Sequence, residues 1–213
     1  MDFSTTLETI LANKIVAIIR GVNTADVKQI VTALNDGGVK VLEITLNSPD
    51  ALKTIEELNK EYGDKLLIGA GTVLDASEAR AAMAAGARFV ISPSYDHAVI
   101  TITKKLGCVS IPGAFTATEV VAAYKSGADI VKVFPASIGS HYIKDLRGPL
   151  PHIPLMPTGG VHLNNIKDFF EAGAVAVGIG SALVDSKQKL TDDYLNNLKN
   201  KAAMFVKAAN EIS

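Results

Sequence analysis

Eight short apolar runs recur along the chain, separated by stretches with helical periodicity. They are nearly continuous in valine, isoleucine and leucine and do not alternate with polar residues. Such runs are typical of parallel strands that are covered on both faces. The runs are Ile15–Ile19, Val39–Thr45, Leu66–Gly69, Arg88–Ser92, Cys108–Ile111, Ile130–Phe134, Ile153–Met156 and Ala174–Ile179.

A glycine precedes five of these runs, at positions 38, 86, 107, 127 and 173. Each glycine lies where a helix is expected to end in a left-handed cap before the chain enters a strand. The spacing of roughly 20 to 25 residues fits a repeated βα unit. Helices are expected over about Ser4–Asn13, Ala25–Asn35, Glu78–Ala85, Thr118–Lys125 and Thr191–Asn210.

This alternation predicts the α/β class. In a chain of 213 residues, eight strands alternating with helices favour a (β/α)8 TIM barrel with an extra N-terminal helix. An open, doubly wound sheet is the structural alternative. No Pro/Gly/Ser-rich linker or block of charge divides the chain, so residues 1–213 are interpreted as one domain.

The composition excludes several classes of partner. The formal net charge of −1 provides no basic surface for nucleic acid or anionic membrane, so a bound anion has to be held by local groups. Cys108 is the single cysteine, which excludes an intrachain disulfide and is interpreted as a small buried hydrophobe. The sequence has no signal-peptide pattern and no apolar stretch long enough to span a bilayer, and we expect a cytoplasmic location.

Lys132 interrupts an apolar run, between Val131 and Val133. A buried ammonium is costly unless it is paired or becomes neutral, and a neutral amine is a nucleophile towards carbonyl groups. Glu43 is the other charge deeply set in apolar sequence. The two residues are therefore either a structural ion pair, or an imine-forming lysine with a general acid/base; the sequence leaves both interpretations open.

In a barrel, catalytic side chains come from the C-terminal ends of different strands. Arg20, Glu43, Thr72 and Lys132 all lie at or near the ends of apolar runs. The planar guanidinium of Arg20 is suited to binding a substrate carboxylate, although capping a strand end or pairing with a loop acid is an equally good interpretation.

Glycine turns follow the last two runs, in Met156–Val161 and Gly178–Ala182, and the second is expected to open a helix. Free N–H groups in such turns bind phosphate without a cationic side chain, and many barrels bind phosphate after strands seven and eight. We favour a phosphate site over tight turns without a ligand. No metal site is expected, because the four histidines lack ligand spacing: His97, His141, His152 and His162.

Six motifs resemble those of the 2-keto-3-deoxy-6-phosphogluconate (KDPG) / 4-hydroxy-2-oxoglutarate (KHG) aldolase family. The likeness runs in order from about Val16 to Leu183. The motifs are Leu42-Glu-Ile-Thr-Leu46, Ile68-Gly-Ala-Gly-Thr-Val73, Ile91-Ser-Pro93, Ile111-Pro-Gly113, Val131-Lys-Val-Phe-Pro-Ala136 and Pro157-Thr-Gly-Gly160.

The resemblance implies a metal-free, homotrimeric class I aldolase that forms a covalent imine with its substrate and needs no cofactor. It implies reversible cleavage of KDPG to pyruvate and glyceraldehyde 3-phosphate, and also of KHG to pyruvate and glyoxylate. The alternatives are the phosphogalactonate epimer as substrate, a thiamine-phosphate synthase or phosphosugar epimerase on the same barrel, and a non-catalytic barrel that binds phosphometabolites.

The resemblance also implies roles for single residues. Lys132 corresponds to the imine-forming lysine and Glu43 to the general acid/base. Thr72 corresponds to a residue that binds the pyruvyl carboxylate, Pro93 lines the pocket and Phe134 covers the imine. The implied phosphate ligands are the backbone amides of Gly159, Gly160, Gly180 and Ser181.

Two positions depart from a single pattern. Some family members carry an arginine where this chain has Asn47, so the carboxylate is assigned to Arg20. Leu46-Asn-Ser-Pro49 resembles the phosphogalactonate branch, whereas Thr158 resembles the gluconate branch, in which a hydroxyl reads the C4 centre. We give Thr158 the greater weight.

Overall fold

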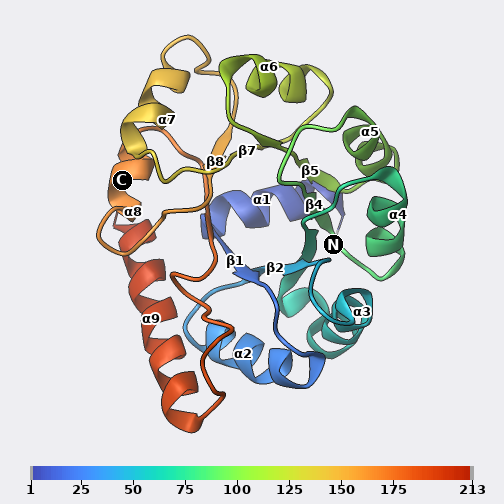
Figure 1. Ribbon diagram of the computed structural model, residues 1–213, viewed down its shortest axis with the longest axis vertical. Helices are drawn as coiled ribbons and strands as arrows, with labels where there is room; N and C mark the ends of the chain where they lie inside the picture. Colours follow the sequence, from blue (N-terminus) through green and yellow to red (C-terminus); the bar gives the residue numbers. More distant parts are fainter. Residues whose placement is uncertain (1, 212–213) are drawn as a thin grey trace.

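The computed structural model describes residues 2–211, apart from the side chain of Asp64, and helices and strands alternate along this range (Figure 1). The predicted domain 1–213 begins and ends just outside these residues. The strands are β1 Ile15–Ile19, β2 Val41–Thr45, β3 Leu67–Gly71, β4 Phe89–Ile91, β5 Val109–Ile111, β6 Gly113–Ala114, β7 Val131–Val133, β8 Leu155–Pro157 and β9 Val177–Ile179. The helices are α1 Phe3–Asn13, α2 Thr24–Asp36, α3 Ala51–Tyr62, α4 Ala76–Ala84, α5 His97–Lys105, α6 Ala117–Lys125, α7 Ser140–Arg147, α8 Ile166–Glu171 and α9 Asp192–Asn210, with a 3-10 turn at Gly63–Lys65.

The strands form two parallel sheets. One has the order β5-β4-β3-β2-β1-β9 and the other the order β6-β7-β8. The α/β class is confirmed, whereas the predicted barrel is not seen as one unbroken eight-stranded sheet. The fifth predicted run, Cys108–Ile111, ends with β5, and the chain then passes through Pro112, which has no N–H to donate to a ladder, into the short strand β6. A single bridge between Thr158 and Gly178 joins β8 to β9.

The glycines before the strands have the predicted left-handed conformation. Gly38, Gly86, Gly107, Gly127 and Gly173 have φ between 75° and 102°. Each lets a helix end and the chain turn back into a strand. The five helices that the sequence analysis gave by residue range are present, with ends that differ by at most two residues from the expected ones.

One expected helix is wrong. The segment Gly178–Ala182 does not open a helix; residues 181–183 form a single turn, in which the N–H groups of Leu183 and Val184 both donate to the carbonyl of Gly180. An Asx turn follows at once, since Asp185 Oδ1 accepts the N–H of Lys187. This local bond competes with helix continuation, and the next helix, α9, begins only at Asp192.

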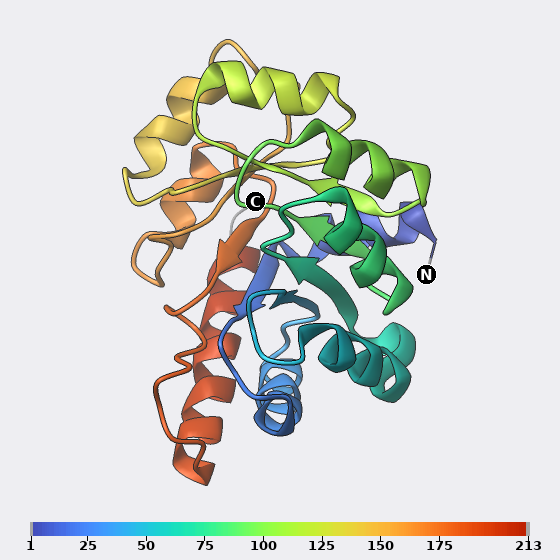
Figure 2. The same ribbon diagram turned by 45° about the vertical axis from the view of Figure 1, so that its right-hand side comes forward.

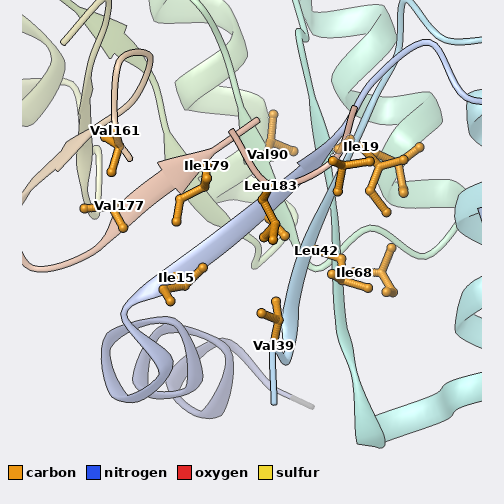
Figure 3. Close-up of a cluster of buried hydrophobic side chains, with 14 of the residues drawn as sticks. Ile15, Ile19, Val39, Leu42, Ile68, Val90, Val161, Val177, Ile179 and Leu183 are labelled. Carbon is orange, nitrogen blue, oxygen red and sulfur yellow. The ribbon is translucent and has the colours of Figure 1, made fainter. Parts of the chain in front are cut away.

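Two apolar layers explain why the strands have nearly continuous hydrophobic sequences. The outer layer lies between strands and helices, and Figure 3 shows Ile15 and Ile19 of β1, Leu42 of β2 and Ile179 of β9 within it. The inner layer consists of alternate strand residues together with Ile10 of α1, including Val16, Val41, Leu67, Phe89, Val109, Ile130 and Met156. Alternation along each strand sends successive side chains to the two layers.

The flanking helices take part in this packing. Helix α1 lies across the middle of the molecule (Figure 1) and contacts β1, β2 and β5, where Ile10 closes the inner layer at the N-terminal end of the strands. Helix α9 packs against α2 and α8 (Figure 2). The inner face of the strands therefore remains available for polar groups only towards their C-terminal ends. Within residues 2–211, no helix combines the length and the apolar character needed to cross a membrane.

Candidate active site

Lys132 lies on the inner face of β7, in the layer above Ile130, because residues two apart on a strand share a face. Its side chain is buried, with 3% of the residue exposed. Nζ lies 5.1 Å from the centre of the Phe134 ring. Burial lowers the pKa of Lys132 below its usual value; the charge of Glu43 opposes this shift and that of Arg20 adds to it. The neutral amine is thus favoured.

Glu43 lies on the inner face of β2 and is completely buried. Neither carboxylate oxygen has a hydrogen-bond partner within the described part of the chain, so Lys132 and Glu43 do not form a direct hydrogen-bonded pair. Burial raises the pKa of Glu43, opposed by the charges of Lys132 and Arg20. A buried carboxyl group without a partner is costly for the fold, and this cost points to a functional role.

Glycines in β3 make room for Glu43. In the β2–β3 register, Glu43 is opposite Gly69 and Thr45 is opposite Gly71. A Cβ on Gly71 would overlap with the carboxyl group of Glu43, and one on Gly69 would overlap with the ring of Phe89. Thr72, directly after β3, is half-buried and has the left-handed φ of 57°. Such backbone strain in a non-glycine residue is frequent at functional sites.

Arg20 follows β1 and its side chain is exposed. The next residue is held in place by a hydrogen bond from the N–H of Gly21 to Ser48 Oγ at 2.9 Å, and Ser48 Oγ lies 2.9 Å from Thr45 Oγ1. This network joins the loop after β1 to the loop after β2. Thr45 and Ser48 lie in the motifs Leu42–Leu46 and Leu46–Pro49, but no role was predicted for either, because their hydrogen bonds link two loops that are distant in sequence.

The turns after β8 and β9 present free backbone donors. Gly159 and Gly160 have φ of 83° and 81°, and a Cβ on Gly160 would lie 2.6 Å from Ser137 Cα. In the part of the chain that the structure describes, the N–H groups of Gly159, Gly160, Gly180 and Ser181 have no protein acceptor. Free backbone N–H groups of this kind can bind an anion.

The hydroxyl of Thr158 is another buried group without a partner. Thr158 has 4% of its surface exposed, and within residues 2–211 its Oγ1 makes no hydrogen bond. Gly178 lies beside it across the β8–β9 bridge, and a Cβ there would overlap with Oγ1. Ser92, next to Pro93, is buried, and its hydroxyl likewise has no partner among the described residues; it lies in the motif Ile91-Ser-Pro93, in which only Pro93 was given a role.

A cavity of about 240 Å³ brings most of the predicted residues together. Arg20, Phe134, Thr158, Gly159, Gly180 and Ser181 line it. Lys132, Glu43, Thr72, Pro93 and Gly160 are not among its lining residues. Five further residues that were not predicted also line the cavity: Ile18, Val184, Asp185, Ser186 and Lys187. The last four belong to the segment between β9 and α9, which carries no periodic pattern.

A larger hollow of about 560 Å³ lies elsewhere, between the starts of α3 and α4. It contains none of the predicted site residues, and Glu78 in its wall is already engaged by the N–H of Leu74. We therefore identify the smaller cavity as the candidate site. Across residues 2–211, no three His, Cys, Asp or Glu side chains are grouped so as to hold a metal ion.

The sequence matches a known family model and two known relatives over most of its length. The sequence model of the family described as KDPG and KHG aldolase matches residues 7–199. The chain is 36% identical, over 92% of its length and 95% of the relative's, to the 2-dehydro-3-deoxy-6-phosphogalactonate aldolase of Escherichia coli K12. It is 32% identical, over 85% and 87% of the two lengths, to the 2-dehydro-3-deoxy-phosphogluconate aldolase of Treponema pallidum.

A solved structure is similar over almost the whole chain. The KDPG aldolase of Legionella pneumophila, in which pyruvate was captured as a covalent carbinolamine, matches with a TM-score of 0.78 and 28% identity, over 98% of both chains.

Proposed function

This chain belongs to the KDPG and KHG aldolase family, and we propose that it is a class I aldolase that cleaves KDPG reversibly to pyruvate and glyceraldehyde 3-phosphate. Cleavage of KHG to pyruvate and glyoxylate is the second activity. The observation that carries the proposal is the buried amine of Lys132, which interacts electrostatically with the buried carboxyl group of Glu43, a group without a hydrogen-bond partner among the described residues. The carbinolamine in the Legionella relative supports the same chemistry.

The first step is addition of the neutral Lys132 amine to the C2 ketone. The carbinolamine then loses water to give a protonated imine, which withdraws electrons from C3. The lowered pKa of Lys132 favours the nucleophilic form. The ring of Phe134 covers the imine. Its centre lies about 5 Å from Nζ of Lys132, and an apolar ring at this position keeps water away from the reacting atoms.

Glu43 is the general acid/base. It accepts the proton of the C4 hydroxyl as the C3–C4 bond breaks, and the electron pair of that bond passes to the imine nitrogen as an enamine forms. The aldehyde product leaves. Glu43 then returns the proton to C3, and addition of water to the imine releases pyruvate and the free amine.

Arg20 and Thr72 bind the carboxylate, and the amides of Gly159, Gly160, Gly180 and Ser181 bind the phosphate at the other end of the substrate. Pro93 lines the pocket. The shared cavity of Arg20 and the glycine turns supports this arrangement, as do their free donors.

Thr158 selects the C4 configuration of gluconate. Its buried, unpartnered hydroxyl supports this role, since a buried donor gains from a substrate hydroxyl. The phosphogalactonate epimer is the second candidate, favoured by the 36% identity to the Escherichia coli enzyme and by Leu46-Asn-Ser-Pro49. Comparing kcat/KM for the two epimers decides between them.

We also propose one domain, in which the two sheets form a single (β/α)8 barrel. The adjacency of β1 to both β2 and β9 supports this closure, together with the Thr158–Gly178 bridge and the direct continuation of β5 into β6 through Pro112. The homotrimer rests on the family resemblance, and light scattering in solution tests it. Absence of a metal cofactor and a cytoplasmic location stay predictions; full activity in EDTA would also separate this enzyme from metal-dependent barrels.

Borohydride reduction in the presence of pyruvate is the decisive experiment. We expect a reduced pyruvyl adduct on Lys132 in peptide mass spectra, and none in Lys132→Ala. An adduct on another lysine, or none at all, contradicts the mechanism. Binding of these keto acids without turnover would instead support a non-catalytic barrel.

A further inference from the structure

Lys187 is a cationic residue of the candidate cavity to which the sequence analysis gave no role. It lines the same 240 Å³ cavity as Gly159, Gly180 and Ser181, the turns with free N–H groups. It comes from the segment that joins β9 to α9, six residues after Ser181. Its side chain is exposed, and among residues 2–211 it has no ion-pair partner.

The segment that carries Lys187 is fixed at its base. The N–H of Lys187 donates to Asp185 Oδ1 at 3.0 Å. The hydroxyl of Tyr194, in α9, lies 3.2 Å from both the N and the O of Asp185, accepting from one and donating to the other. The backbone from which Lys187 extends is thus tied to a long helix, while its ammonium group remains free to meet a ligand.

The charges of the cavity decide what Lys187 does there. Its lining contains two cations, Arg20 and Lys187, and one anion, Asp185, a net formal charge of +1. Without Lys187 the net charge would be zero. A phosphate monoester carries between one and two negative charges near neutral pH, and backbone amides supply dipoles but no formal charge. With Arg20 assigned to the carboxylate, only Lys187 remains as a cation for the phosphate.

We propose that Lys187 is a phosphate-binding residue that supplies the charge for the anion held by the amides of Gly159, Gly160, Gly180 and Ser181. For the phosphorylated keto acid as ligand, this inference rests on the proposed function. Lys187 is thereby a specificity residue that favours phosphorylated over unphosphorylated substrates. Its positive charge is needed because the carboxylate of Asp185, which lines the same cavity, repels a phosphate.

Inorganic phosphate tests the site without any turnover. Its affinity is measured by calorimetric titration for the wild type, Lys187→Ala, Lys187→Arg and the matched control Lys189→Ala, an exposed lysine outside the cavity lining. We expect Lys187→Ala to weaken phosphate binding about fivefold, the upper range for an exposed charge pair, and the other two variants to bind like the wild type. Added salt should narrow the difference, because it screens exposed charges.

Turnover gives the second measurement. Lys187→Ala should raise KM for KDPG without a change in kcat. For KHG, which has no phosphate, neither kcat nor KM should change. Phosphate affinity equal in Lys187→Ala and Lys189→Ala overturns the proposal, as does an equal loss on both substrates. If the wild type cleaves neither substrate, the proposed function fails, and the phosphate titration still decides the role of Lys187.

Discussion

Gly71 lies so close to Glu43 that a methyl group on this glycine would overlap with the carboxyl group. The two residues are diagonal neighbours on the inner sides of β2 and β3, because the register sets Glu43 opposite Gly69 and Thr45 opposite Gly71. The carboxyl group of Glu43 therefore rests over the backbone of β3. Its position depends on the absence of a side chain there, because no hydrogen bond within the described residues holds the carboxyl group in place.

Gly71→Ala should displace the Glu43 carboxyl group. We expect kcat to fall about 100-fold, the cost of a small misplacement of a catalytic group, and the free energy of unfolding to fall by about 1–3 kcal/mol through overpacking. Steady-state kinetics and urea unfolding measure the two effects. Gly148→Ala is the control, since its Cβ would meet only atoms at 3.5 and 4.0 Å. Normal kcat in Gly71→Ala would contradict the assigned role of Glu43.

Lys132→Met tests whether Lys132 and Glu43 form a structural ion pair. Methionine has a similar length and no charge to desolvate, so we expect stability to change by less than about 1.5 kcal/mol. Turnover should fall about 10⁵-fold or more, the scale observed when a covalent nucleophile is removed. Calorimetric unfolding and borohydride trapping measure both quantities. A large loss of stability would restore the ion-pair interpretation.

The stability of the wild type should also depend on pH through Lys132. Its folded-state pKa lies below the usual 10.5, so between these two values the unfolded chain binds more protons and the free energy of unfolding rises with pH. Lys132→Met should lack this rise. Parallel rises in the two proteins would assign the pH dependence to other groups.

The parts of the site that lie on strands could be predicted from sequence. Lys132 and Glu43 stand out because a charge inside a continuous apolar run must be buried, and the glycine turns stand out because they follow the last two runs. The ends of several helices could also be predicted, because a glycine with a left-handed conformation stands where the chain turns from a helix into the next strand.

Loop residues outside the glycine turns could not be predicted in this way. Ser48 and Lys187 owe their positions to hydrogen bonds with residues distant along the chain or to a local Asx turn, and neither leaves a periodic pattern. The sequence predicts a helix after β9 because Gly180-Ser-Ala182 suits a helix start as well as a single turn. The carboxylate of Asp185, three residues later, accepts the N–H of Lys187 and forms an Asx turn in place of a helix. The division of the sheet at Pro112 could not be predicted either, because it depends on strand pairing between distant segments: β5 pairs with β4, whereas β6 pairs with β7.

Two substitutions should shift the pH profile of imine formation in opposite directions. Adduct formation needs the neutral amine, so its rate should rise with pH and level off below 10.5, the usual pKa of lysine. Glu43 raises the pKa of Lys132 and Arg20 lowers it. Glu43→Gln should therefore move the midpoint to lower pH and Arg20→Gln to higher pH. Borohydride trapping with pyruvate across pH measures the midpoints, and shifts of the same sign would contradict the electrostatic coupling.

Ser48 should act as a positioning residue for Arg20. Ser48→Ala removes the acceptor for the N–H of Gly21, and losing one such hydrogen bond costs about 1 kcal/mol, or about a fivefold change in affinity. We expect KM for both keto acids to rise by this factor while kcat is unchanged, because the carboxylate is bound in the same way in the substrate and in the transition state. Ser48→Thr should restore the wild-type KM. An effect on kcat alone would point to a different role.

Thr158→Val should reduce the preference between the C4 epimers at almost no cost in stability. Valine has nearly the same shape, and it removes a buried hydroxyl that has no partner in the described residues, so the melting temperature should be equal or higher. In the reaction, the same hydroxyl is expected to bind the C4 hydroxyl of the gluconate epimer, and its loss should lower the ratio of kcat/KM values about tenfold. The ratio is measured with both epimers under identical conditions, and Thr158→Ser, which keeps the hydroxyl, should retain most of it. A wild-type preference for the galactonate epimer, or an unchanged ratio in Thr158→Val, would move the selection of C4 away from Thr158 and towards the loop after β2, where Leu46-Asn-Ser-Pro49 lies.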